Sequence, residues 1–210
     1  MPIIIRGLEE ARKRILDLES KFKTRVVIGI TGKPGAGKST ATSKLKEMIP
    51  GEKAVILSQD GYHLSNLQLE SLGRSNFKGA PDTFDSEGFA KILLRVKSEL
   101  KNNIYFPIFH REIEESISAE GLITEKTNVV LVEGNYLLFE THGWGEVAKH
   151  LDEIWYLQVD DDLRLSRLVA RHIEFGKNPQ VAAAWAQGSD EANARLIERV
   201  RDKANAFLLV

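Results

Sequence analysis

The sequence predicts a three-layer α/β fold around a mainly parallel sheet, with a small hairpin and a lid beside it. Apolar runs rich in β-branched residues lie at 25–31, 53–58 and 127–132, as expected for parallel strands that are buried on both faces. Segments with apolar residues at helical spacing separate these runs. The chain has 210 residues, of which 42% are hydrophobic and 28% are charged, so one domain with a substantial core is expected.

Composition narrows the classes of function. Cysteine is absent, which excludes disulfides, thiol catalysis and thiolate metal sites. Lys plus Arg total 29 and Asp plus Glu total 30, so no basic excess indicates a nucleic-acid partner. The first apolar run is too short for a signal peptide, and no run approaches the length of a membrane span. We therefore expect a cytoplasmic protein without nucleic-acid or membrane partners, and a homodimer is left open.

The N-terminal segment, residues 1–24, is expected to be an amphipathic helix over 7–22 that packs on a phosphate-binding domain spanning 25–210. A role of this helix in binding a partner is the alternative, and ordinary core packing is favoured. The other predicted helices lie at 39–49, 86–100, 161–173 and 189–205, and further strands at 153–159 and 206–210.

A hairpin or flap is predicted between residue 103 and a turn near Gly121. The extended stretch 103–111 contains Pro107, which favours an edge strand, and polar and apolar residues then alternate. We expect this hairpin to lie beside the main sheet.

Residues 32–39, with the letters GKPGAGKS, match the phosphate-cradling P-loop pattern G-x-x-x-x-G-K-S. The predicted strand before it and the predicted helix after it stand in the order that this loop requires, which disfavours a glycine turn without a ligand. Glycines let backbone N–H groups approach a phosphate, and the positive end of the helix dipole faces the same anion. Lys38 then reaches the β and γ phosphates and the Ser39 hydroxyl holds Mg²⁺. The predicted nucleotide-binding residues are Gly32, Lys33, Pro34, Gly35, Ala36, Gly37, Lys38, Ser39 and Thr40.

Carboxylates follow two of the predicted strands. Asp60 comes just past the strand 53–58, and Glu133 ends the strand that begins at 127. Open α/β sheets bind ligands at this carboxyl edge, and an acid after such a strand positions Mg²⁺ in P-loop enzymes. For Asp60, a helix N-cap or turn position is an equally good interpretation, because Asp-Gly is a common turn pair.

Two aspartates lie in the predicted loop 78–85. Asp85 stands where it can cap the following helix, so capping is the favoured interpretation. Asp82 has no such structural role and is the better candidate for contacting a substrate. His63 is a weaker candidate, because histidines are also common on surfaces and at helix starts.

Arginines supply candidate phosphate contacts. Arg111 either binds substrate or phosphate, or forms a surface ion pair with one of the nearby glutamates. Arg164, Arg167 and Arg171 are spaced i, i+3 and i+7, so they share a helix face. This spacing favours a lid over the transferring phosphate, and a solvated basic face is the alternative.

Taken together, these motifs resemble the phosphoribulokinase, uridine kinase and pantothenate kinase family of P-loop kinases. The segments that carry the resemblance are GKPGAGKST, SQDGYHL, APDTFD, YFPIFHRE, VVLVEGN and RLSRLVAR, and it extends over nearly the whole chain from Arg25. The pattern is most similar to the branch of nucleoside/nucleotide kinase-like and fructose-transport-associated kinases. Family members phosphorylate a hydroxyl of a small metabolite with ATP and Mg²⁺.

The resemblance implies roles for individual residues. Asp60 matches the catalytic base, Glu133 the magnesium-associated acid, and Arg111 a substrate-region arginine. The predicted catalytic residues are Lys38, Asp60, Glu133, Arg167 and Arg171, the metal-binding residues Ser39 and Glu133, and the substrate-binding residues Asp60, Tyr62, His63, Asp82, His110, Arg111 and Tyr136. Two departures disfavour a strict uridine kinase. His110 stands where relatives often carry an acid, and His172 follows Arg171 in place of a second arginine with an aspartate.

The predicted function is ATP- and Mg²⁺-dependent transfer of the γ-phosphoryl group to a hydroxyl of a nucleoside, a pantothenate-like compound or a sugar. A nucleoside monophosphate kinase is one alternative, and its acceptor, already a phosphate, needs no base. A non-catalytic, nucleotide-dependent regulatory protein is the other. The sequence contains no N/T-K-x-D guanine motif after a later strand, which favours ATP.

Overall fold

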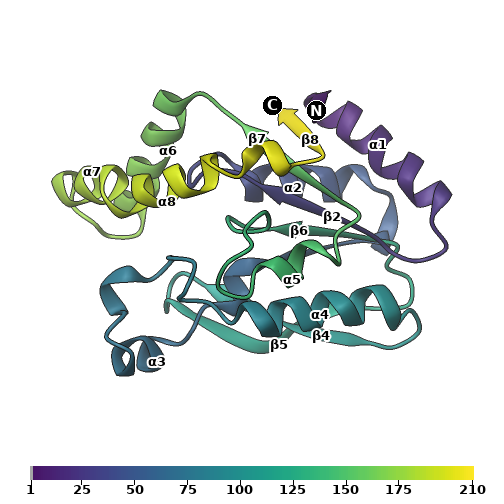
Figure 1. Ribbon diagram of the computed structural model, residues 1–210, viewed down its shortest axis with the longest axis horizontal. Coiled ribbons are helices and arrows are strands. Elements are labelled where there is room, and N and C mark those ends of the chain that lie inside the picture. Colours follow the sequence, from purple (N-terminus) through teal and green to yellow (C-terminus); the bar gives the residue numbers. More distant parts are fainter. Residues whose placement is uncertain (1) are drawn as a thin grey trace.

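The computed structural model describes residues 2–210 and contains a central sheet of six strands in the order β1-β8-β7-β2-β6-β3 (Figure 1). Every neighbouring pair in this sheet is parallel. The strands are β1 (Ile3–Arg6), β2 (Val26–Thr31), β3 (Ala54–Ser58), β6 (Val129–Glu133), β7 (Glu153–Gln158) and β8 (Ala206–Leu209). All six residues of β2 are buried, because the strand lies inside the sheet and is covered on both faces.

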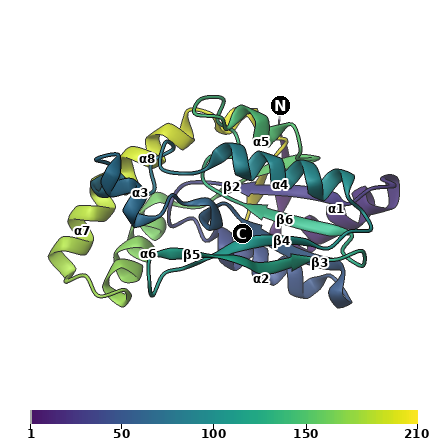
Figure 2. The ribbon, with the colours of Figure 1, turned by 90° about the horizontal axis from the view of Figure 1, so that it is seen from below.

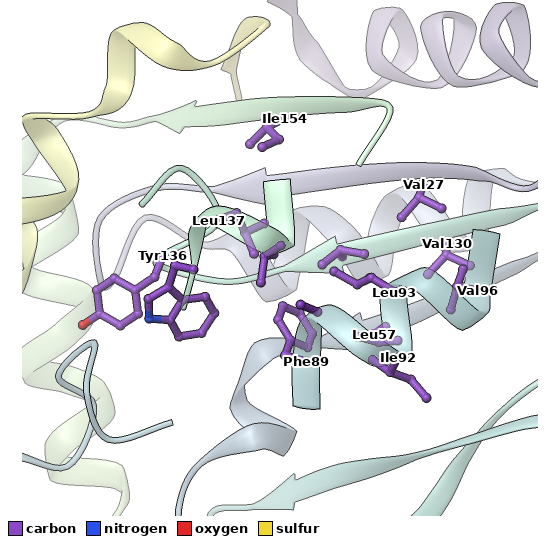
Figure 3. Close-up of a cluster of buried hydrophobic side chains, with 14 of the residues drawn as sticks. Val27, Leu57, Phe89, Ile92, Leu93, Val96, Val130, Tyr136, Leu137 and Ile154 are labelled. Atoms are coloured by element: carbon purple, nitrogen blue, oxygen red, sulfur yellow. The ribbon is translucent and has the colours of Figure 1, made fainter. Parts of the chain in front are cut away.

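Helices cover both faces of the sheet and make the three layers (Figures 1 and 2). On one face, α1 (Gly7–Lys21) and α2 (Lys38–Met48) bury a core that includes Ile28, Leu45 and Trp155. On the other face, α4 (Ser86–Ser98) and α5 (Gly145–Ala148) bury a larger core, which Figure 3 shows in part. Successive side chains of a strand point to opposite faces of the sheet, so alternate residues of each strand contribute to the two cores.

A separate antiparallel hairpin of β4 (Ile104–His110) and β5 (Glu115–Ile123) lies beside α4 (Figure 2). Its register shifts between Phe106 and Ile108, at the proline that cannot donate to the ladder. The hairpin packs against the short turn of helix η2 (Gln59–Tyr62) that follows β3. A Cβ on Gly61 would lie 2.3 Å from the Pro107 carbonyl oxygen, so only glycine allows this approach.

Three helices extend beyond the carboxyl ends of the strands. They are α6 (Asp161–Glu174), which follows β7, and then α7 (Pro179–Gln187) and α8 (Ser189–Glu198) (Figure 1). A shorter helix, α3 (Asn66–Ser71), projects from the same end of the molecule below them. Within residues 2–210, no helix is both long enough and apolar enough to cross a membrane.

The predicted fold class is confirmed, but several elements differ from the sequence-based expectation, which contains neither α3 nor α5. The segment expected to contribute only a helix also supplies β1, a four-residue edge strand paired with β8. Between the helices predicted at 161–173 and 189–205 the structure has a further helix, α7: Pro179 is at its start and the Asn178 side chain caps it. The helix predicted to reach residue 205 ends at Glu198.

Candidate active site

The P-loop lies between β2 and α2, with its glycines in the backbone conformation that the loop needs. Gly35 and Gly37 have φ of 81° and 91°, in the left-handed region that favours glycine. The Lys38 ammonium group donates hydrogen bonds to the carbonyl oxygens of Gly32 at 2.8 Å and Lys33 at 3.1 Å. The lysine side chain is therefore folded back over the loop that would hold the phosphates.

The charges that act on the Lys38 ammonium group come from several elements of the fold. Burial lowers the pKa of the ammonium group to about 8, and Glu133 and Asp60 oppose this shift. Arg171 and Arg111 lower the pKa further. The Lys38 ammonium group of the P-loop is therefore within electrostatic range of residues from the ends of two strands, from the hairpin turn and from α6.

Glu133 ends β6 and lies beside the start of α2. Its Oε1 accepts a hydrogen bond from the Ser39 hydroxyl at 3.2 Å, and its Oε2 accepts one from the Thr42 hydroxyl at 3.2 Å. A hydroxyl and a carboxylate are ligands that suit Mg²⁺, which usually takes one or two protein ligands and completes its shell with phosphates and water. Within residues 2–210, no group of three or more acidic, histidine or cysteine side chains is arranged to hold a metal ion.

Asp60 follows β3, and its carboxylate is not used for capping. The hydroxyl of Ser58 caps η2 by accepting from the Asp60 backbone N–H at 3.2 Å. The Asp60 carboxylate instead accepts from Arg111 Nη2 at 2.8 Å. For Asp60 the structure therefore favours a pocket carboxylate over a helix cap, and it pairs Arg111 with this aspartate and not with the neighbouring glutamates.

The three arginines of α6 have different environments, although the sequence places them on one face. Arg164 is only 1% exposed and donates to Asp161 at 2.8 Å, to Glu191 at 2.6 Å and to the Pro34 carbonyl at 3.4 Å. It therefore fastens α6 to the P-loop and to α8. Arg164 shares the helix face of Arg167 and Arg171, but neighbouring carboxylates and the P-loop enclose its side chain.

The other two arginines face the phosphate-binding region. Arg167 is exposed, and its Nη1 lies 3.4 Å from the position of a Cβ built on Gly37. The pKa of Arg171 is lowered, mainly by burial and next by Arg111, against the opposing charges of Asp190 and Asp60. Arg171 forms no side-chain hydrogen bond or ion pair with residues 2–210. Arg167 therefore lies beside the P-loop and the charge of Arg171 acts on Lys38, while contact of either guanidinium group with a phosphate stays a prediction.

Two predicted substrate residues are largely buried tyrosines. Tyr136 is 0% exposed and its hydroxyl donates to the Gly79 carbonyl at 2.5 Å. Tyr62 packs against Phe89 with the ring centroids 4.9 Å apart. Burial raises the pKa of both phenols. Both tyrosine rings therefore pack into or against the core on the α4 side of the sheet, and direct contact with a substrate stays a prediction.

The remaining predicted residues have protein partners. Asp82 pairs with Arg74 at 2.7 Å, and Asp85 caps α4 by accepting from the Gly88 N–H at 2.8 Å, as expected for Asp85. His110 contacts Glu120 across the hairpin at 2.6 Å. Elsewhere, Lys33 of the P-loop pairs with Asp161 at 2.6 Å, Thr40 is exposed, and His63 lies between Phe84 and Phe109.

Sequence reasoning missed three side chains around the site. Thr42 follows Ser39 by three residues, so helical spacing was a signal for it. Lys78 donates to Asn66 at 2.7 Å and lies over the Phe109 ring at 5.2 Å. Asn193 of α8 donates to the Gly79 carbonyl at 3.4 Å across 114 positions of sequence, and no local pattern indicates that contact.

The fold and these contacts define a class of protein. A glycine loop between a central parallel strand and a helix, with acids at the ends of adjoining strands, is the arrangement of P-loop phosphotransferases. More particularly, residues 27–205 match the Phosphoribulokinase / Uridine kinase family, and the chain belongs to that family.

Individual relatives agree with this assignment. The chain is 32% identical over 157 residues to a uridine kinase of Clostridium tetani (strain Massachusetts / E88), covering 72% of this chain and 70% of that protein. It is 30% identical over 202 residues to the uncharacterized protein YggC of Escherichia coli K12. This match covers 92% of this chain and 82% of that protein. Among solved structures, the "putative fructose transport system kinase" of Silicibacter sp. TM1040 matches with a TM-score of 0.85 and 34% identity, over 97% of this chain and 98% of that one.

Family membership and the P-loop together make this chain an ATP-dependent small-molecule kinase. The resemblance that the motifs indicated is therefore confirmed at the level of family, fold and enzyme class.

Proposed function

We propose that this kinase transfers the γ-phosphoryl group of ATP, with Mg²⁺, to a hydroxyl group of a small metabolite. The observation that carries the proposal is the position of the Asp60 carboxylate. The Ser58 hydroxyl caps the η2 turn, so the Asp60 carboxylate is not needed for capping. Arg111 Nη2 donates to this carboxylate at 2.8 Å, and the negative charge of the carboxylate acts on Lys38 of the P-loop. A carboxylate held this close to the phosphate-binding lysine serves as a base for a hydroxyl.

In the proposed reaction, Asp60 accepts the proton of the acceptor hydroxyl. The hydroxyl oxygen forms a bond to the γ-phosphorus as the bond from that phosphorus to the bridging oxygen breaks, so ADP leaves and the proton remains on Asp60. Lys38 and the loop amides hold the triphosphate, and Arg167 and Arg171 neutralise charge on the moving phosphoryl group. Arg111 keeps the Asp60 carboxylate oriented toward the acceptor.

The proposed Mg²⁺ ligands are the Ser39 hydroxyl and Glu133, the latter acting directly or through a bound water. The ion supplies positive charge that offsets the phosphate oxygens during transfer. The Thr42 hydroxyl lies 3.2 Å from Glu133 Oε2 and 3.0 Å from the Ser39 carbonyl oxygen, and it can donate its single proton to either.

The candidate acceptors are a nucleoside, a pantothenate-like compound and a sugar. Relatives named uridine kinase and pantothenate kinase support the first two, and the fructose-transport name of the solved structure supports the third. A nucleoside monophosphate acceptor is disfavoured, because an anionic phosphate needs no base and would meet the Asp60 carboxylate.

A screen of acceptors tests the proposal. ADP release is measured with ATP, Mg²⁺ and each of uridine, pantothenate, D-fructose and uridine monophosphate. We expect turnover with at least one of the three hydroxyl compounds and none with the monophosphate. In Lys38→Ala the turnover should be nearly abolished while circular dichroism stays unchanged, since the lysine binds phosphate and is not a core residue. Preference for the monophosphate, or full activity of Lys38→Ala, would overturn the proposal.

A further inference from the structure

Gln59 lies between the two acids that the proposed reaction uses. It precedes Asp60 and follows Ser58, which is paired with Glu133 at the ends of β3 and β6. The backbone ladder between these two strands ends at this pair. Gln59 is 0% exposed, so its side chain is enclosed at the point where the two carboxylates leave the sheet.

The Gln59 side chain continues the link between the two strands beyond the backbone ladder. Its Oε1 accepts a hydrogen bond from the buried Tyr136 N–H at 3.0 Å. Gly134 packs against the same amide, because a Cβ at this position would lie 2.4 Å from Oε1 and 2.8 Å from the Gln59 Cβ. Gln59 therefore ties the end of β3 to the turn 134–136, which directly follows Glu133.

The central strand holds the same turn on its other side. The Gly134 N–H donates to the Ile30 carbonyl at 3.2 Å, and the Thr31 hydroxyl donates to the Asn135 carbonyl at 3.1 Å. The Tyr136 side chain that follows belongs to the core on the α4 side (Figure 3). The turn is thus fixed to β2 by two hydrogen bonds and to the end of β3 by the glutamine.

This link is kept although it is unfavourable for stability. Only the oxygen of an amide can accept from an N–H group, so the bond to Tyr136 fixes the orientation of the Gln59 amide. Its Nε2 is buried and has no hydrogen-bond partner in residues 2–210. A half-paired polar side chain in a core is less favourable than an apolar one of the same shape. Such a side chain is expected where function, and not packing, requires it.

We propose that Gln59 is a positioning residue that sets the separation between Asp60 and Glu133. In the proposed reaction one carboxylate takes the proton of the acceptor and the other attends the metal, so their separation decides whether the reacting groups are aligned. Without the tie, the turn after Glu133 can move away from the end of β3. This inference rests on the proposed function and adds a residue that acts through the two acids.

The first test needs no turnover. Amide hydrogen exchange, followed by NMR in the free protein, reports on the Tyr136 N–H. We expect this amide to be protected in the wild type and to exchange at least about tenfold faster in Gln59→Met, which keeps the length of the side chain but has no strong acceptor. Thermal stability should stay near that of the wild type, because the change removes one unpaired donor and creates another. An unprotected Tyr136 amide in the wild type, or an unchanged rate in Gln59→Met, would overturn the inference.

The second test uses the acceptor found in the screen. Gln59→Met should lower the single-turnover rate by about tenfold, with little change in ATP affinity. In an Asp60→Asn background the same change should lower the rate by less than about twofold, since the position of the base matters only while the base is present. Gly134→Ala displaces the same amide from the other side and should reproduce the loss of the single variant.

A destabilised variant serves as the control. Arg25 is 3% exposed and lies just before β2, at the end of that strand away from the P-loop. Arg25→Lys should therefore keep the wild-type rate in its folded fraction and leave the Tyr136 amide protected relative to global unfolding. An equal loss of rate in Arg25→Lys and Gln59→Met would show that lost stability alone explains the effect.

The failures of the two proposals are distinguishable. A Gln59→Met rate within about twofold of the wild type, or a loss by the same factor with and without Asp60, would refute the positioning role alone. If Asp60→Asn keeps the wild-type rate, the proposed base is wrong, and the exchange experiment still decides whether Gln59 holds the turn.

Discussion

At the scale of single residues, the burial of Lys38 has a consequence for the pH dependence of nucleotide use. Its pKa of about 8 lies below the ordinary lysine value of 10.5, so the free enzyme carries the charge below about pH 8 and loses it above. We expect kcat/KM for ATP to fall as the pH rises through this range. Lys38→Arg should be slower but should lack this decline, because a guanidinium group stays charged.

The measurement is kcat/KM for ATP between about pH 6 and pH 10, which reports groups of the free enzyme. A profile that stays flat up to about pH 10 in the wild type would show that Lys38 keeps its proton in this pocket. Saturating ATP should move the decline to higher pH, since bound phosphates favour the charged ammonium group.

Glu133 gives a second prediction at this scale. Glu133→Gln keeps the shape of the side chain and an oxygen facing Ser39, but removes the charge. Turnover should require more Mg²⁺ and fall by more than the affinity for metal-free nucleotide does. Titrations of rate against Mg²⁺ and of nucleotide binding in a chelator separate the two effects. Glu47→Gln, on the exposed face of α2, is the matched control. A wild-type Mg²⁺ dependence of Glu133→Gln would make Glu133 a structural acid only.

At the scale of elements, α6 packs directly on the P-loop. A Cβ on Gly35 would lie 2.6 Å from the Leu168 side chain and 2.7 Å from the Arg164 carbonyl oxygen. Together with the Arg164 ion pairs, this contact holds the first turns of α6 against the loop. We therefore expect Arg167 and Arg171 to be in place before the nucleotide binds.

Replacing these arginines tests whether they act on the transferring group. Arg171→Ala and Arg167→Ala should each lower the turnover, by roughly 10²–10³-fold if the lost group contributes as a typical transition-state donor does. ADP affinity should fall much less, because ADP lacks the transferred phosphoryl group. Arg195→Ala, at a side chain that is 73% exposed on α8, is the control. Equal losses in turnover and ADP affinity would indicate ground-state binding, and no loss would indicate a solvated basic face.

Arg25 joins elements on the opposite side of the molecule. It is 3% exposed and its guanidinium group meets only backbone carbonyls, so burial lowers its pKa with no carboxylate to offset it. The acceptors are the carbonyl oxygens of Val96, Glu99, Leu100, Thr124 and Thr127. Through these hydrogen bonds, the Arg25 side chain links the end of α4 and the β5–β6 connection to the start of β2.

Arg25→Lys should be destabilising, because an ammonium group cannot reach all of these carbonyls and leaves several of them buried without a partner. We expect the free energy of unfolding to fall by about 2–4 kcal/mol. Urea unfolding measures it, with Lys23→Ala as an exposed neighbouring control. A decrease below about 0.5 kcal/mol, the usual range for surface substitutions, would show that water replaces these hydrogen bonds without loss.

At the scale of the whole molecule, the sequence predicts the layers of the fold well, because strands buried on both faces leave strong apolar runs. It does not predict β1, where only Ile5 of four residues is buried and the segment gains order by pairing with β8. Nor does it predict α7, because a proline looks like a break unless the Asn178 cap is recognised. The order of β1 depends on a distant strand that periodicity does not reveal, whereas the cap of α7 is a local contact between Asn178 and the Val181 N–H.

In the candidate site too, the sequence predicts some of the contacts and does not predict others. Lys38, Ser39 and Glu133 follow from a local motif and a strand end, and the structure brings them together. The partner of Asp60 does not follow, because Arg111 lies 51 positions away and its target depends on how the hairpin packs. Arg164 shares the spacing of Arg167 and Arg171, yet Asp161 and Glu191 enclose it. Spacing identifies a helix face, but the neighbouring elements decide what covers each side chain.

The account as a whole depends on Asp60 being the base for a hydroxyl acceptor. The most direct measurement is single-turnover phosphotransfer by Asp60→Asn to the acceptor found in the screen. Asp85→Asn, a matched change at a helix cap, serves as the control. A positioned base contributes roughly 10²–10⁴-fold in rate, so Asp60→Asn should lose about that much with little change in ATP affinity. A rate within a few-fold of wild type, or a nucleoside monophosphate as the best acceptor, would contradict the account.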